Sequence, residues 1–88
     1  MRFISDSGHG WLEVPTVDVI TAGVAPSRYS YLDAATGMSY LEEDCDASAY
    51  LHAVGCTKGL TCEDCIAPIQ ADIYIDGDCW VRGLPRYA

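Results

Sequence analysis

The sequence predicts a small α+β domain, in which a mainly antiparallel sheet of hairpins carries two short helices. Its 88 residues suffice for one modest core, so a single domain over residues 1–88 is expected. Strand-like segments occur in pairs around turn-forming residues, which is the pattern of hairpins. Apolar residues with helical spacing lie between those pairs. The expected order of elements is therefore ββαββαββ.

Two hairpins are expected in the first half of the chain. The first joins residues 2–5 to residues 11–14 through the turn-forming stretch Ser5-Asp6-Ser7-Gly8. The second joins residues 28–32 to residues 38–43, and its Tyr29 and Tyr31 alternate onto one face.

A first helix is expected over residues 16–22. Pro15 suits the first position of a helix, and Gly23 can cap the C-terminal end. Because the segment is rich in β-branched residues, a strand over residues 17–20 is the alternative. The apolar residues at helical spacing are Val17, Ile20 and Val24.

A second helix is expected after the acidic stretch, with Asp44 or Asp46 as its N-terminal cap and Gly55 at its end. One apolar stripe is formed by Ala47, Tyr50, Leu51 and Val54.

A third hairpin is expected near the end of the chain. Residues 71–75 alternate, Asp76-Gly77 is a two-residue turn signal, and residues 79–82 read as the returning strand. This pairing would place Trp80 opposite Ile73.

The charge of the chain limits its partners. Thirteen acidic and five basic residues give a formal net charge of −8, and Lys58 is the only base between Asp33 and Asp78. Direct nucleic-acid binding needs a basic surface, and an anionic membrane would repel this chain. An acidic surface instead favours a cationic protein partner, such as the basic nucleic-acid-binding surface of a host complex.

The cytoplasm is the expected location. The first twenty residues contain Asp6, Glu13, Pro15 and Asp18 and no apolar core of a signal peptide. The five cysteines are then expected as reduced thiols or metal ligands.

Three cysteines form a candidate zinc site: Cys62 and Cys65 have the spacing of a zinc knuckle, and Cys56 precedes them. Cys45 and Cys79 are candidates to complete the ligand set. A second Cys-x-x-Cys pair is missing, so we expect no cofactor, and structural zinc stays the alternative.

No enzyme activity is expected. Cys45 and His52 are seven residues apart, but the acids around Cys45 disfavour the thiolate that a nucleophile requires. The neighbouring carboxylates lack the spacing of a calcium-binding loop.

The acidic stretch YLEEDCD, residues 40–46, is the candidate partner-binding site. A solvated acidic edge is the simpler interpretation of these acids. Tyrosine-rich strands also favour a homodimer that buries an exposed sheet face. The predicted partner-binding residues are Tyr40, Glu42, Glu43, Asp44, Asp46, Glu63, Asp64 and Asp76.

Two parts of the chain carry a resemblance to a known group: HGWLEVP at residues 9–15, and YSY at residues 29–31 with YLEEDCDA at residues 40–47. They resemble small uncharacterised proteins of phages and mobile elements in proteobacteria. The resemblance covers roughly residues 8–54 and implies a phage accessory protein. Size, acidity and setting are similar to those of anti-CRISPR and other anti-defence inhibitors.

The expected function is therefore a phage-encoded inhibitor whose acidic surface binds a host nucleic-acid-handling complex and blocks DNA access. The alternative is a small structural or adaptor module stabilised by zinc on the cysteine cluster.

Overall fold

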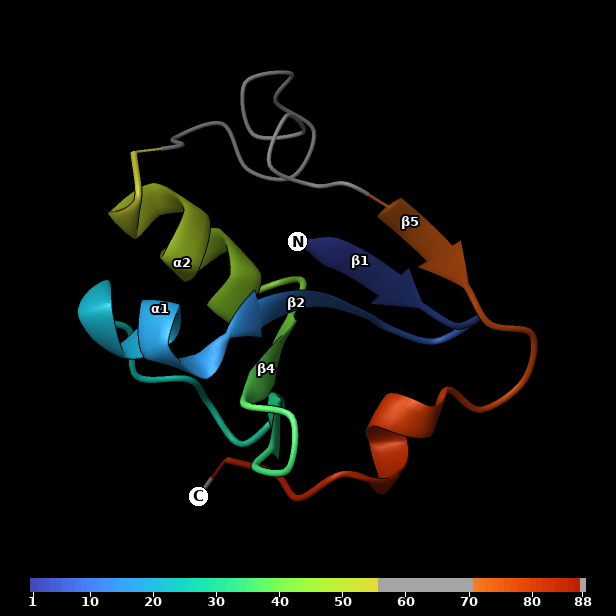
Figure 1. Ribbon diagram of the computed structural model, residues 1–88. Helices are drawn as coiled ribbons and strands as arrows, with labels where there is room; N and C mark the ends of the chain where they lie inside the picture. Colours follow the sequence, from blue (N-terminus) through green and yellow to red (C-terminus); the bar gives the residue numbers. More distant parts are fainter. Residues whose placement is uncertain (56–70, 88) are drawn as a thin grey trace.

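The computed structural model of the protein describes residues 1–55 and 71–87, and these form an α+β domain (Figure 1). Five strands make one sheet in the order β3-β4-β2-β1-β5. Neighbouring strands are antiparallel except β1 and β5, which are parallel. The predicted α+β class with a mainly antiparallel sheet is confirmed. The elements are β1 (Arg2–Ser5), β2 (Gly10–Pro15), α1 (Thr16–Thr21), β3 (Tyr31–Asp33), β4 (Met38–Glu42), α2 (Asp46–Ala53), β5 (Ala71–Tyr74) and the 3₁₀ helix η2 (Trp80–Gly83).

Both hairpins of the first half are confirmed. β1 pairs with β2, where Phe3 lies opposite Leu12, and β3 pairs with β4, where Tyr31 lies opposite Tyr40. In the second hairpin loop, Gly37 has φ +72°, a conformation that glycine adopts without steric cost.

The third hairpin was predicted wrongly. β5 pairs in parallel with β1, so Ile73 lies opposite Ile4 and not Trp80. Residues 80–83 form η2 instead of a returning strand. The turn signal itself is real, since Gly77 has φ +90°. After this turn the chain packs Val81 against the sheet, and that tertiary contact prevails over the local strand pattern.

The sheet is covered on both faces (Figure 1). α1 and α2 cover one face, where the buried apolar residues are Leu12, Val14, Val19, Leu41, Ala47, Tyr50 and Leu51. η2 and the segment around it cover the other face, where the buried residues are Ile4, Trp11, Tyr31, Tyr40, Cys79 and Val81. The central strands β2 and β4 are therefore buried on both sides.

α1 is a helix, as favoured over the strand alternative; Ala22 caps its C-terminal end, and Gly23 follows with φ +76°. Its buried residue is Val19, whereas Val17 is 65% and Ile20 is 71% exposed. The predicted apolar stripe was thus placed on the wrong side of the helix. In this six-residue helix only one residue is buried, so helical spacing in the sequence could not identify the buried position.

α2 begins one residue after Cys45, and neither predicted aspartate caps it through its side chain. Ala47, Tyr50 and Leu51 are buried as predicted, but Val54 is exposed beyond the end of the helix. In the described ranges, 1–55 and 71–87, no helix has the length and apolar character needed to cross a bilayer.

The end of the described chain lies along the outer edge of β3. Leu32 donates its N–H to the carbonyl of Pro85, and Tyr87 donates its N–H to the carbonyl of Ser30. Tyr31 and Arg86 form an isolated antiparallel bridge. These bonds fix the position of Arg86 relative to β3.

Candidate functional site

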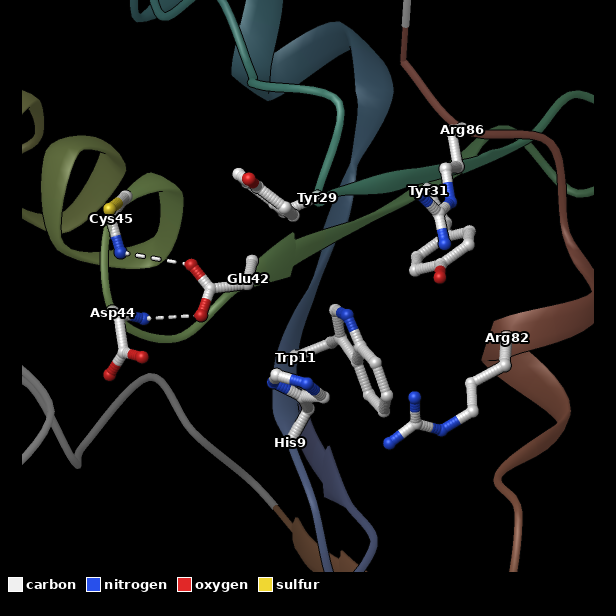
Figure 2. A pocket seen from close by; sticks show the side chains of 9 residues that line it. All are labelled: His9, Trp11, Tyr29, Tyr31, Glu42, Asp44, Cys45, Arg82 and Arg86. Carbon is white, nitrogen blue, oxygen red and sulfur yellow. Dashed lines mark hydrogen bonds between the residues drawn. The ribbon is translucent and has the colours of Figure 1, made fainter.

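A pocket of about 410 Å³ lies on the face of the sheet covered by η2 (Figure 2). Four separate stretches of the chain line it. His9 directly precedes β2 and Trp11 lies in it, whereas Tyr29 lies two residues before Tyr31, the first residue of β3. The end of β4 and the turn after it contribute Glu42, Asp44 and Cys45, and the C-terminal segment contributes Arg82 and Arg86.

Asp6 fixes the basic side of the pocket. Its carboxylate accepts hydrogen bonds from Arg82 Nε at 2.6 Å and Nη2 at 2.9 Å. It also accepts from the backbone N–H groups of Gly8, His9 and Cys79. The Arg82 hydrogen bonds, helped by these backbone donors, hold the pKa of Asp6 well below its usual range despite burial. The turn between β1 and β2 is thereby joined to η2.

Arginines stack on the aromatic floor of the pocket. The guanidinium carbon of Arg82 lies 5.3 Å from the ring centre of Trp11, and that of Arg86 lies 5.7 Å from the ring centre of Tyr31. The rings of Trp11 and Tyr31 pack edge to face, with their centres 5.9 Å apart. The indole Nε1 of Trp11 is buried and has no hydrogen-bond partner among the described residues.

Glu42 organises the acidic side. It is buried, and its two carboxylate oxygens accept the N–H groups of Asp44 and Cys45, each at 3.1 Å (Figure 2). It therefore shapes the turn between β4 and α2. Asp44 is exposed at this turn. Desolvation is the largest cause of the raised pKa of Glu43, and the nearby charges of Asp44 and Glu42 raise it further.

Two other predicted partner-binding residues also act inside the fold. Asp46 is buried and accepts hydrogen bonds from the N–H and hydroxyl of Ser27 and from the hydroxyl of Ser30. Tyr40 is buried and donates its hydroxyl to Glu13 at 2.8 Å. Burial is the largest cause of the raised pKa of Tyr40, and the hydrogen bond to Glu13 is the second largest.

The remaining predicted acids divide into two groups. Glu43, Asp44 and Asp76 reach the surface, with Glu43 half-buried and the other two exposed. Glu63 and Asp64 lie outside the described residues. Glu43 and Asp44 are thus the part of the acidic stretch that a partner could contact.

A second ion pair lies on β1 and β2. Arg2 donates from Nε to Glu13 at 2.7 Å, and this hydrogen bond is the main cause of the lowered pKa of Glu13. Two of the five basic residues, Arg2 and Arg82, are therefore engaged with buried acids.

The predicted zinc ligands Cys56, Cys62 and Cys65 lie outside the described residues. Cys79 is buried in the apolar cluster under η2, and Cys45 is exposed at the pocket. Within the described ranges, no group of three potential metal-ligating side chains occurs.

The pocket residues are far apart in the sequence, and no sequence pattern groups them. His52, considered with Cys45, lies on α2 outside the pocket lining, whereas His9 is part of it. The HGW, YSY and EEDC stretches were recognised as motifs, and the fold brings all three to one pocket. No local pattern indicates Arg82 or Arg86, because the packing of η2 brings Arg82 to the pocket and the pairing of the C-terminal segment with β3 brings Arg86 there. Comparison of the chain with protein-family models, curated proteins and solved structures finds no match.

Proposed function

We propose that the protein is a non-enzymatic inhibitor that binds the basic nucleic-acid-binding surface of a host protein complex and blocks DNA access. The charge balance is the observation that carries this proposal. Removing the two ion-paired acids from thirteen leaves eleven, and removing their two arginines from five leaves three bases. The surplus of eight negative charges is therefore carried by groups outside these two pairs. Such a surplus steers a protein toward cationic surfaces.

The turn after β4 is the contact region that we assign to this function. Asp44 is exposed there, Glu43 is half-buried beside it, and Tyr29 lines the same pocket with 55% of its surface exposed. A rigid aromatic side chain beside carboxylates suits an interface with arginine and lysine side chains. The resemblance of these stretches to small phage proteins supports an anti-defence role, of which anti-CRISPR inhibition is one form.

Capture from host lysate tests the proposal. Tagged protein is incubated with nuclease-treated lysate at moderate salt, and bound proteins are identified. We expect recovery of a DNA-handling complex with the native protein and its loss with Asp44→Lys. Asp18→Lys is the matched control, because it changes an exposed acid on α1 and shifts the net charge equally.

Three results would contradict parts of this proposal. Recovery of the complex with Asp44→Lys at native level would exclude the turn after β4 as the contact. If no nucleic-acid-handling complex binds the native protein, the proposed inhibitor function is wrong. Binding that does not weaken as salt is raised would contradict the electrostatic mechanism.

A further inference from the structure

The pocket concentrates positive and aromatic groups in a chain that has few bases. Two of the five Lys and Arg residues line it, together with Trp11, Tyr29 and Tyr31. Arg82 is held by Asp6 through Nε and Nη2, which leaves its Nη1 without a hydrogen-bond partner in the described structure. Arg86 stacks on Tyr31 and has no carboxylate partner in those same ranges. Both guanidinium groups therefore retain donors for an anion.

A further donor lies in the floor. Trp11 is only 2% exposed, and its Nε1 is unpaired within the part of the chain that the structure describes. Figure 2 shows the Nε1 edge of the indole turned toward the side of the pocket where Glu42 and Tyr31 lie. A buried unpaired donor costs folding free energy, and an acceptor brought by a ligand would relieve that cost.

The pocket wall opposite the two arginines is acidic. Among residues 1–55 and 71–87, no group donates a hydrogen bond to the Asp44 carboxylate, and each Glu42 oxygen accepts one of the two bonds it can take. Figure 2 shows these acids across the aromatic residues from Arg82 and Arg86. A matching ligand has a planar body, N–H donors at one end and an anion at the other.

We propose that this pocket binds a free nucleoside monophosphate, with its phosphate at Arg86 and Arg82 and its base beside Tyr29 and Trp11. Guanidinium groups match phosphate oxygens geometrically, and bases stack on aromatic rings. A guanine edge offers two adjacent N–H donors to a carboxylate. The volume of about 410 Å³ lies within the range of roughly 300–1,000 Å³ that small-ligand pockets have.

The charge of the whole molecule favours a free nucleotide over a strand. Beyond the pocket, a polynucleotide would place further phosphates near a surface with a large acidic surplus. A monophosphate needs only the two arginines, and the distant acids are screened beyond about 8 Å at physiological ionic strength.

NMR titration of the ¹⁵N-labelled protein with GMP tests the assignment. The protein has two tryptophans, and Trp80 lies outside the pocket lining, packed edge to face on Tyr40. We expect the Trp11 indole resonance to move in a saturable manner and the Trp80 resonance to stay. Guanosine and inorganic phosphate, tested separately, should each bind more weakly than GMP.

Variants locate the two ends of the ligand. Arg86→Gln should weaken GMP binding about tenfold or more, the effect of losing one charge-assisted hydrogen bond. Arg2→Gln is the matched control, because it removes the same charge from an arginine on β1 that does not line the pocket. Tyr29→Ala should weaken binding roughly fivefold or more through lost stacking. Unchanged Trp80 and core methyl resonances establish that each variant is folded.

Four results would overturn the proposal. The first three are a Trp11 resonance that does not respond to millimolar GMP, inorganic phosphate binding as tightly as GMP, and equal losses in Arg86→Gln and Arg2→Gln. Tighter binding of a short single-stranded DNA than of GMP would also overturn it. The titration uses the isolated protein, so its outcome is independent of whether a host complex is captured.

Discussion

At the scale of single residues, Asp6 joins the turn after β1 to the C-terminal segment. Its two oxygens receive five hydrogen bonds, from Arg82 and from the backbone of Gly8, His9 and Cys79. Its position in a Ser-Asp-Ser-Gly turn was predicted from the sequence, but its ion pair with Arg82 was not. No local pattern links residues 76 positions apart in the chain.

Asp6→Asn should destabilise the protein by about 2–3 kcal/mol, because Arg82 loses its charge partner and a buried acceptor is replaced by a donor. Urea unfolding followed by tryptophan fluorescence measures the change. Asp18→Asn, an exposed change of the same chemistry, should stay within about 0.5 kcal/mol. Equal effects of the two substitutions would refute a special role for Asp6.

The lowered pKa of Asp6 also sets a pH dependence. In the unfolded chain this carboxyl titrates near its ordinary pKa of about 3.9, whereas in the folded protein it stays ionised to much lower pH. The unfolded state therefore binds more protons in this window, and stability falls as pH drops below about 4–5. Glu13 contributes with the same sign. Unfolding curves between pH 7 and pH 2.5 should show this loss, and Asp6→Asn should make it shallower; an unaltered slope in the variant would contradict the assignment.

At the scale of elements, local patterns were sufficient where neighbours in sequence are neighbours in space. The hairpins β1–β2 and β3–β4 and the two helices follow from alternation, turn residues and helical spacing. Alternation predicted the strand β5, but its pairing and the formation of η2 were beyond such patterns, because β5 pairs in parallel with the distant β1 and Asp6 binds Arg82 of η2. Of the candidate site, Asp44 was predicted and lies at the pocket, whereas Tyr40 and Asp46 serve the core.

The docking of α1 depends on one side chain. Val19→Ala should cost about 2 kcal/mol, because it removes methyl groups that pack between the helix and β2. Val17→Ala makes the same change in the same helix at an exposed position, and it should be neutral or slightly stabilising, since alanine favours helix. Thermal unfolding of the two variants measures the difference. A larger loss in Val17→Ala would show that the helix docks through its other side.

At the scale of the whole molecule, an excess of acids is combined with two arginine–carboxylate pairs. Arg2 and Arg82 are partly exposed and pair with buried acids, and exposed acids such as Asp18, Asp44 and Asp78 contribute to the negative charge of the exterior. The composition was sufficient to predict that the net charge is negative. Which of the acids are buried depends on how the sheet packs. Glu42 accepts a backbone hydrogen bond within a turn, and Asp46 accepts a hydrogen bond from a serine hydroxyl. A run of acidic residues in the sequence indicates neither role.

The zinc alternative is tested on the whole protein. If Cys56, Cys62 and Cys65 held a structural zinc, a chelator would lower the melting temperature and Cys62→Ser with Cys65→Ser would mimic that loss. Under the inhibitor function we expect neither treatment to change the melting temperature. Metal analysis of the purified protein provides the independent measurement, and stoichiometric zinc would favour the adaptor function.

The bond between Asp6 and Arg82 also sets an order for completing the fold during synthesis. The β1–β2 hairpin leaves the ribosome before η2, and one face of Trp11 stays uncovered until η2 has been made. The nascent chain therefore carries an exposed aromatic surface while the residues between the hairpin and η2 are synthesised, and chains in such a state are prone to aggregate. Neither the pocket nor the part of the core under η2 can form before that segment is present.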